Sequence, residues 1–183
     1  MSEKNLKKAN LGITFENKIN RANEHYLDHD IAVIYKKPTP IQLVRVLYPK
    51  RSRVKIQEAY FKVPSTTDYN GIYKGRYIDF EAKSTKLTNF PFSRIYEHQI
   101  KHLIKVKNHG GISFILLEFS LIREIYLIPI EEFIKYYYDE SVNKRKSLAY
   151  KTVIEIGYLI KPNDYVEVNY IDSVEEYIKK TLK

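Results

Sequence analysis

Three ionisable side chains alternate along the segment 77–83. Asp79, Glu81 and Lys83 are separated from one another by single apolar residues. Because successive side chains of a β-strand point to opposite faces, the three charged groups would project from one face of such a strand. Carboxylate oxygens are the ligands that Mg²⁺ prefers, and a neighbouring lysine can orient a water molecule or help to deprotonate it. The segment therefore predicts a strand that supports metal-assisted hydrolysis.

A second carboxylate stands where it could complete such a site. Asp68 precedes Glu81 by thirteen residues. Lys74-Gly75 is a turn signal, and so is Asn70-Gly71, which comes just after Asp68. We expect a hairpin at this turn to fold Asp68 back onto the strand. An exposed strand face with alternating charge is the simpler alternative, because the pattern Glu-X-Lys alone is frequent by chance. The aspartate before the turn and the basic surroundings favour the site.

The charge of the chain is unevenly distributed. Residues 1–110 hold 21 Lys+Arg against 10 Asp+Glu, whereas residues 111–183 hold 10 against 12, so the net charge of +9 arises in the first part. Basic residues are densest between 36 and 62, where aromatic residues are interleaved, and this composition favours contact with a phosphate backbone. A solvated surface face is the alternative. The residues that we assign to such contacts are Lys36, Lys37, Lys50, Arg51, Arg53, Lys55, Lys62 and Arg76.

The 183 residues are predicted to form one domain, because no internal repeat, low-complexity tract or glycine-serine linker is present. The pattern of apolar residues and turn signals indicates an α/β fold in which helices flank a mixed central sheet. The expected helices are 11–26 with Asn10 as N-cap, 93–107, 129–138 and 173–181. The expected strands are 31–35, 41–48, 53–63, 76–84, 112–119 and 124–128, while 142–168 is ambiguous.

Composition also bounds the cellular setting. The chain has no cysteine, which fits a reducing compartment. It shows neither a signal-peptide core nor an apolar run that is long enough, and free enough of charge, to cross a membrane. We expect a cytoplasmic, nucleoid-associated protein that does not contact membranes.

Longer motifs place these residues in a family. An aspartate followed by Glu-X-Lys is the PD-(D/E)XK spacing of restriction-endonuclease-like nucleases, and over about residues 10–130 the chain resembles the RecU family of Holliday junction resolvases. The resemblance is carried by Lys36-Lys37-Pro38-Thr39-Pro40, Tyr48-Pro49-Lys50-Arg51, Lys55-Ile56-Gln57-Glu58-Ala59-Tyr60-Phe61, Ser65-Thr66-Thr67-Asp68-Tyr69-Asn70-Gly71, Lys74-Gly75-Arg76-Tyr77-Ile78-Asp79-Phe80-Glu81-Ala82-Lys83, Phe90-Pro91 and His98-Gln99-Ile100.

The resemblance implies a restriction-endonuclease-like fold in a single nuclease domain, 1–183. A basic β stalk at about 40–65 would project into the junction centre, and we expect about 130–183 to form a C-terminal helical cover. A homodimer would make paired symmetric nicks in four-way DNA junctions during recombination and repair. The cofactor would be one or two Mg²⁺ ions, for which Mn²⁺ can substitute. A recombinase or branch-migration protein would be a further partner.

The resemblance also assigns the site. The family's catalytic positions fall on Asp68, Glu81 and Lys83, with Gln99 as a supporting polar residue. The backbone carbonyl of Ala82 would join Asp68 and Glu81 as a metal ligand. The remaining supporting residues are Thr66, Thr67 and, on the first helix, Glu16. Asp79 shares the face but is outside the catalytic set, and we assign it a role in supporting the catalytic residues or a structural role.

One departure and three alternatives accompany this assignment. Leu11 stands where family members usually have arginine, which puts in question a DNA-distorting role for this end of the helix. The chain could instead be a restriction- or repair-type nuclease that cuts linear duplex DNA, or a non-catalytic DNA-binding or recombinase-regulating module. His98 and His102 have the spacing of a zinc protease, but Gln99 replaces the required glutamate and no third ligand is apparent.

Overall fold

A computed structural model describes residues 3–38, 40–50, 53–61, 66–139 and 146–181. Its helices are α1 (Glu3–Asp28), η1 (Phe92–Arg94), α2 (Glu97–Asn108), α3 (Ile130–Tyr137), α5 (Tyr150–Ile156) and α6 (Tyr170–Thr181). Its strands are β1 (Val33–Lys36), β2 (Ile41–Lys50), β3 (Arg53–Phe61), β4 (Tyr69–Tyr73), β5 (Arg76–Thr85), β6 (Asn89–Pro91), β7 (Ile112–Phe119), β8 (Glu124–Pro129), β9 (Ser147–Ala149) and β10 (Tyr158–Leu159).

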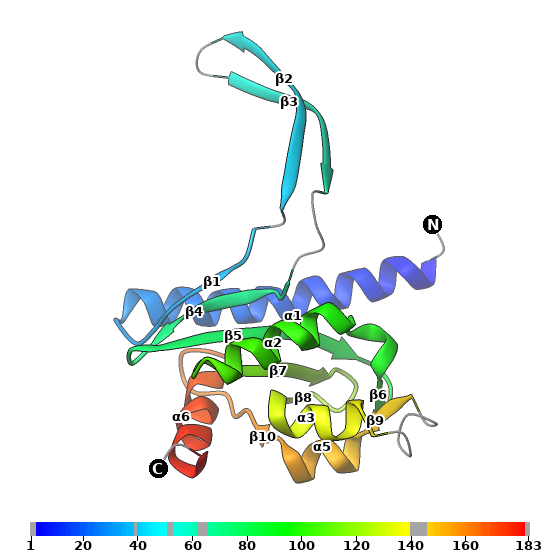
Figure 1. Cartoon of the computed structure of the whole chain (residues 1–183), viewed down its shortest axis with the longest axis vertical. Helices are drawn as coiled ribbons and strands as arrows, with labels where there is room; N and C mark the ends of the chain where they lie inside the picture. The colour runs from blue at the N-terminus through cyan, green and yellow to red at the C-terminus, as the bar shows by residue number, and fades with distance from the viewer. Residues whose placement is uncertain (1–2, 39, 51–52, 62–65, 140–145, 182–183) are drawn as a thin grey trace.

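Six strands form the central sheet, in the order β1-β4-β5-β7-β8-β10. β5 and β7 are parallel, and the other neighbours are antiparallel. α2 connects the parallel pair, as a parallel connection requires. The strands β2 and β3 form a separate antiparallel hairpin that projects far from this body (Figure 1). The predicted α/β class, with a mixed sheet, flanking helices and a projecting hairpin, is confirmed.

Apolar side chains cover both faces of the sheet, so that its middle strands are buried. On one face, α1 and α6 pack against β4, β5 and β7 through a cluster that includes Phe15, Tyr170 and Phe80. On the other face, α2, α3 and α5 pack against β7 and β8 through a cluster that includes Leu103 and Phe133. β5 lies third in the sheet, between β4 and β7, which explains why its two carboxylates, Asp79 and Glu81, are removed from solvent.

Three stacked aromatic rings hold β5 in register. Tyr69 on β4 stacks on Phe80 of β5, and Phe80 stacks on Phe114 of β7, with ring centroids 4.8 Å apart in both pairs. Such cross-strand pairs stabilise a sheet, and a slip of one residue would move every side chain of β5 to the other face. The ladder therefore holds Asp79 and Glu81 on the face opposite Phe80, which is the face that α2 covers.

Of the two predicted turn signals before β5, Lys74-Gly75 is confirmed and Asn70-Gly71 is wrong. Asn70-Gly71 lies inside β4, and the chain reverses at Lys74-Gly75, where φ is 47° and 74°. Gly71 is needed for a different reason: a Cβ atom there would lie 2.1 Å from the carbonyl oxygen of Val33 on β1. The glycine therefore marks a close approach between backbones rather than a turn.

Three predicted helix starts are also wrong. α2 begins at Glu97 rather than at about 93, because Phe92–Arg94 form the separate 3-10 helix η1 and Ile95 is extended. α1 begins at Glu3 rather than after Asn10, because residues 3–9 contain no proline or glycine that would prevent the helix from extending. α6 begins at Tyr170, so Ser173 is a buried residue within the helix and not its cap. The ambiguous segment contains β9, α5 and β10, which are too short to produce a clear period. None of the helices in the described ranges is long and apolar enough to span a membrane.

Candidate functional site

Asp68 and Glu81 come together where β4 meets β5. Tyr69 pairs with Phe80 across the two strands, so the preceding Asp68 lies beside Glu81. A carboxylate oxygen of Asp68 accepts a hydrogen bond of 3.0 Å from the backbone N–H of Ala82. The structure thus brings together the two carboxylates and the Ala82 backbone that the sequence assigned to one site.

Glu81 is fully buried, with a relative exposure of 0%. Its Oε1 atom accepts a hydrogen bond of 2.7 Å from the side-chain amide of Gln99 and also pairs with the ammonium group of Lys83. Its Oε2 atom is buried and has no hydrogen-bond partner among the described residues. Burial raises the pKa of Glu81 to about 7, and the negative charge of Asp68 adds to the increase, while Lys83 and Gln99 oppose it.

Gln99 is oriented by the first turn of α2. Its side-chain oxygen accepts a hydrogen bond of 3.0 Å from the backbone N–H of Tyr96, which precedes the helix, and its amide nitrogen then points to Glu81. The same side chain therefore caps α2 and holds the carboxylate. This explains how a residue eighteen positions after Glu81 reaches the site.

The residues present fit a divalent cation. A buried carboxylate oxygen without a partner is costly, and a cation beside it would supply the missing interaction. Within the described ranges, no group of three His, Cys, Asp or Glu side chains could hold a metal. A cation here would therefore depend on Asp68, Glu81 and other oxygen donors, such as a main-chain carbonyl or water. An oxygen-only donor set suits Mg²⁺ or Mn²⁺ rather than Zn²⁺.

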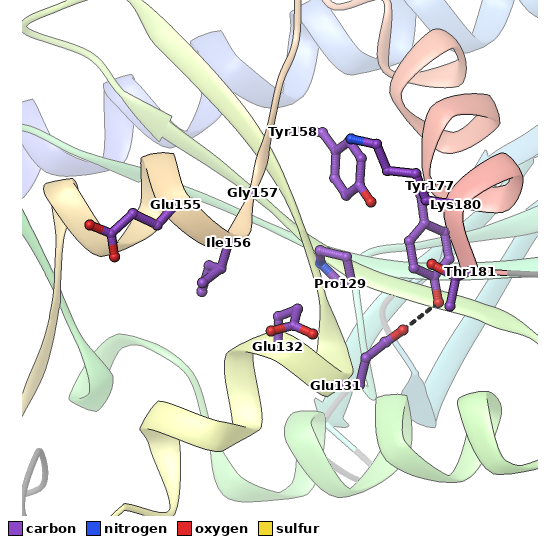
Figure 2. A pocket seen from close by; sticks show the side chains of 10 residues that line it. All are labelled: Pro129, Glu131, Glu132, Glu155, Ile156, Gly157, Tyr158, Tyr177, Lys180 and Thr181. Carbon is purple, nitrogen blue, oxygen red and sulfur yellow. Dashed lines mark hydrogen bonds between the residues drawn. The ribbon is translucent and has the colours of Figure 1, made fainter.

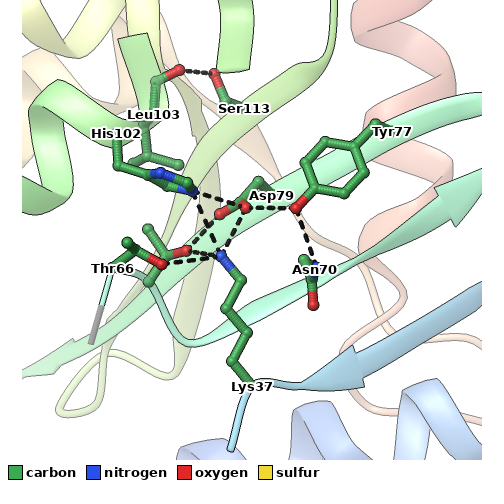
Figure 3. Close-up of polar contacts among 9 residues, drawn as sticks. Lys37, Thr66, Asn70, Tyr77, Asp79, His102, Leu103 and Ser113 are labelled. Carbon is green, nitrogen blue, oxygen red and sulfur yellow. Dashed lines mark hydrogen bonds and ion pairs between the residues drawn. The ribbon is translucent and has the colours of Figure 1, made fainter. Parts of the chain in front are cut away.

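Asp79 occupies a second polar cluster on the same face of β5, shown in Figure 3. Its buried carboxylate receives the ammonium group of Lys37 at 2.7 Å and the hydroxyl of Tyr77 at 3.0 Å. The hydroxyl of Thr67 and a ring nitrogen of His102 complete its surroundings. This cluster was not predicted from the sequence, because its members come from four separate segments of the chain.

The residues predicted to bind DNA lie in different settings. Lys36 forms an ion pair with Glu16 of α1, and Lys37 points inward to Asp79. Arg76 is exposed at the start of β5. Lys50, Arg53 and Lys55 lie on the strands of the projecting hairpin. Arg51 and Lys62 lie outside the described residues.

The other supporting residues are partly brought to the site. Thr66 is exposed and accepts a hydrogen bond of 3.3 Å from Lys37, whereas Thr67 is buried against Asp79. The Glu16 side chain forms an ion pair with Lys36 rather than with Asp68 or Glu81. The two histidines of the zinc-protease spacing have different partners: His98 stacks on Tyr96 with centroids 5.5 Å apart, and His102 faces Asp79.

A separate cavity of about 300 Å³ lies between α3, α5 and α6 and is drawn in Figure 2. None of the residues assigned to the site from the sequence lines it. Glu131 and Tyr177 form a hydrogen bond of 2.5 Å at its wall. The residues that line it are Pro129, Glu131, Glu132, Glu155, Ile156, Gly157, Tyr158, Tyr177, Lys180 and Thr181.

Comparison with known proteins extends the resemblance along the chain. The family model for Recombination protein U matches residues 10–176. A Holliday junction resolvase RecU from Streptococcus agalactiae is 47% identical over 175 residues, which are 95% of this chain and 87% of that protein. Another from Geobacillus sp. is 48% identical over 169 residues, or 92% and 84% of the two chains. Among solved structures, Hjc of Archaeoglobus fulgidus, a Holliday junction resolvase, has a TM-score of 0.47 at 11% identity and covers 80% of this chain and 93% of its own.

Proposed function

The chain belongs to the RecU family, and on this basis we propose that it resolves four-way DNA junctions by paired, symmetric hydrolysis of phosphodiester bonds. The observation that carries the proposal is the pairing of Asp68 with a fully buried Glu81 that has an unpartnered oxygen and a lysine beside it. Such an arrangement is costly to a fold and is retained where chemistry uses it. Homologous recombination and DNA repair are the processes that produce this substrate.

Asp68 and Glu81 would hold one or two Mg²⁺ ions, with the Ala82 carbonyl as a further ligand and with Mn²⁺ as a substitute. When bound, the cation supplies polarisation of the phosphoryl group and acidifies a water molecule. The chain's own groups prepare the site for this: the Ala82 N–H fixes the Asp68 carboxylate, and the Gln99 amide fixes Glu81. Because these contacts exist before substrate arrives, little reorganisation is needed during the reaction.

Lys83 would act on the water and on the developing charge. Lys83 lies two residues after Glu81 on β5, and its ammonium group pairs with the Glu81 carboxylate. From there it can orient a water molecule toward the phosphorus atom and offset negative charge on the phosphoryl oxygens. Only 19% of the Lys83 side chain is exposed, so its charge acts in surroundings less polar than bulk water and is screened less there.

Junction selectivity would come from geometry rather than from base readout. A homodimer presents two active sites related by a two-fold axis, and a four-way junction can adopt the same symmetry. The β2–β3 hairpin would enter the junction centre and contact phosphates through Lys50, Arg53 and Lys55. A recombinase or branch-migration protein is the further partner that this activity calls for.

The test compares substrates that differ only in shape. A mobile four-way junction and linear duplexes with the sequences of its arms are incubated with the protein in Mg²⁺, Mn²⁺, Ca²⁺ or EDTA. We expect nicks at symmetric positions in two opposite strands of the junction, in Mg²⁺ and Mn²⁺ only. Cutting of the linear duplexes as fast as the junction would favour the restriction- or repair-type nuclease. If the protein binds the junction but cuts it with none of the cations, the non-catalytic module is favoured.

A further inference from the structure

The two ends of the projecting hairpin meet at one buried carboxylate. Lys37 follows β1 and leads into the hairpin, while Thr66 and Thr67 lie on the segment that returns from it to β4. The ammonium group of Lys37 lies 2.7 Å from Asp79, 2.5 Å from the hydroxyl of Thr67 and 3.3 Å from that of Thr66. Figure 3 shows Lys37 pointing into the centre of this group.

Lys37 also contacts the active-site segment through its backbone. Its N–H donates a hydrogen bond of 2.7 Å to the carbonyl oxygen of Asp68, one residue beyond Thr67. The strand residue Asp79 lies two positions before Glu81, on the same face of β5. Lys37 is therefore bonded on one side to the segment that carries Asp68 and on the other to the strand that carries Glu81.

The surroundings of Lys37 leave little room for a DNA phosphate. Only 15% of its side chain is exposed, and its charge is matched by Asp79, which has an exposure of 0%. His102 of α2 adds a fourth segment, with a ring nitrogen 3.0 Å from Asp79 and 3.5 Å from the ammonium group. Since a buried carboxylate needs its cation, withdrawing Lys37 to meet a phosphate would leave Asp79 uncompensated.

We propose that Lys37 is a positioning residue for catalysis: together with Asp79 it fixes both ends of the hairpin to β5 and so sets the separation of Asp68 and Glu81. This inference rests on the proposed function. Movement of the DNA-bound hairpin would thereby be passed to the carboxylates through one buried ion pair.

The experiment replaces Lys37 with Met, which keeps an unbranched side chain only one heavy atom shorter and removes its charge. The parent chain is first shown to nick a junction in Mg²⁺, because failure at that stage would reject the proposed function and not this inference alone. The Lys37→Met variant is then assayed for single-turnover cleavage at saturating junction, for junction affinity in Ca²⁺ over a range of salt, and for binding of Mn²⁺ alone by titration calorimetry. Lys101→Met, on the exposed face of α2, is the matched control.

A positioning role predicts a cleavage rate that falls about 10-fold to 100-fold, as expected for reacting groups displaced by about 1 Å. Junction affinity and its salt dependence remain those of the parent. Mn²⁺ affinity falls several-fold, because the separation of Asp68 and Glu81 is no longer fixed. If Lys37 were only a nearby positive charge that repels the cation, its removal would instead raise Mn²⁺ affinity. Lys101→Met changes none of the three.

Two results would overturn the inference. In one, the log–log salt slope of junction binding drops by about 0.9 with an unchanged rate at saturation, which is the signature of one lost phosphate contact. In the other, both the cleavage rate and Mn²⁺ affinity equal those of the parent. If Lys37→Met melts below the assay temperature, the double variant Lys37→Met/Asp79→Asn, which removes both buried charges, is judged by the same criteria.

Discussion

The carboxylate of Asp68 accepts a hydrogen bond of 3.0 Å from the backbone N–H of Ala82, the residue that follows Glu81. The two carboxylates are therefore joined through the main chain of the strand that carries one of them. Burial raises the pKa of Glu81, and the negative charge of Asp68 adds to the increase. The metal-free site is thus poised to bind a cation that neutralises both groups.

The raised pKa of Glu81 predicts how the stability of the metal-free protein depends on pH. The folded state holds a proton on Glu81 up to a pKa of about 7, whereas the unfolded chain releases it near 4.5. The folded state therefore binds more protons between these values, and the free energy of unfolding falls as pH rises through this window. The loss is on the order of 3 kcal/mol, at 1.36 kcal/mol for each unit of pKa.

The measurement is denaturant unfolding in EDTA at pH 4.5 to 8, for the parent and for Glu81→Gln. The variant has no carboxylate to ionise, so its advantage in unfolding free energy should grow with pH and level off above about 7. Taking the difference between the two proteins cancels the other titrating groups. A difference that stays constant across the range would contradict the raised pKa.

Gln99 connects helix stability to catalysis. Gln99→Ala removes the amide that holds Glu81 and also the cap on the Tyr96 N–H. We expect a loss of about 1 kcal/mol in unfolding free energy, typical of a lost cap, together with a cleavage rate at least about tenfold lower.

Glu97→Ala is the control, because Glu97 lies in the same helix turn and forms an ion pair with the exposed Lys101. It should leave the cleavage rate unchanged and cost less than 1 kcal/mol, roughly the value of an exposed ion pair. Equal losses of rate in the two variants would show that Gln99 acts only through the stability of α2.

The hairpin is expected to contribute phosphate contacts. Lys50 and Arg53 are paired in the backbone register of β2 and β3. Replacing both with Ala should weaken junction binding in Ca²⁺ and lower the log–log salt slope by about 1.8, at 0.9 for each contact. Replacing the exposed Lys151 and Lys161 removes the same charge elsewhere. If both double variants change the slope equally, the path of the DNA does not follow the hairpin.

The sequence allowed the strand of the site to be predicted because its period is regular. Alternation of charged and apolar residues around Glu81 placed the carboxylates on one face, and the stacked ring of Phe80 lies on the other, as expected. Asp68 was expected to fold back beside Glu81, and it does so. The turn that brings it there is Lys74-Gly75 rather than Asn70-Gly71, since the latter glycine is required by the approach of β1.

The Asp79 cluster could not be predicted from local patterns. Lys37 precedes Asp79 by 42 residues and His102 follows it by 23, so only the packing of the hairpin ends and of α2 brings them together. In the sequence, Lys37 is one more cation in a basic run, and nothing local marks it as buried. The start of α6 was predicted wrongly for a related reason: packing of the helix buries Ser173, which by itself looks like a cap.

The central claim is that Asp68 and Glu81 carry out cation-dependent cleavage of a four-way junction. The most direct test is a nicking assay on a mobile junction with each strand labelled in turn, comparing the parent chain, Asp68→Asn, Glu81→Gln and the exposed control Asp164→Asn. We predict paired symmetric nicks in Mg²⁺ from the parent and the control, and none from the two site variants, which still bind the junction in Ca²⁺. Nicking by both Asp68→Asn and Glu81→Gln at the parental rate would contradict the account.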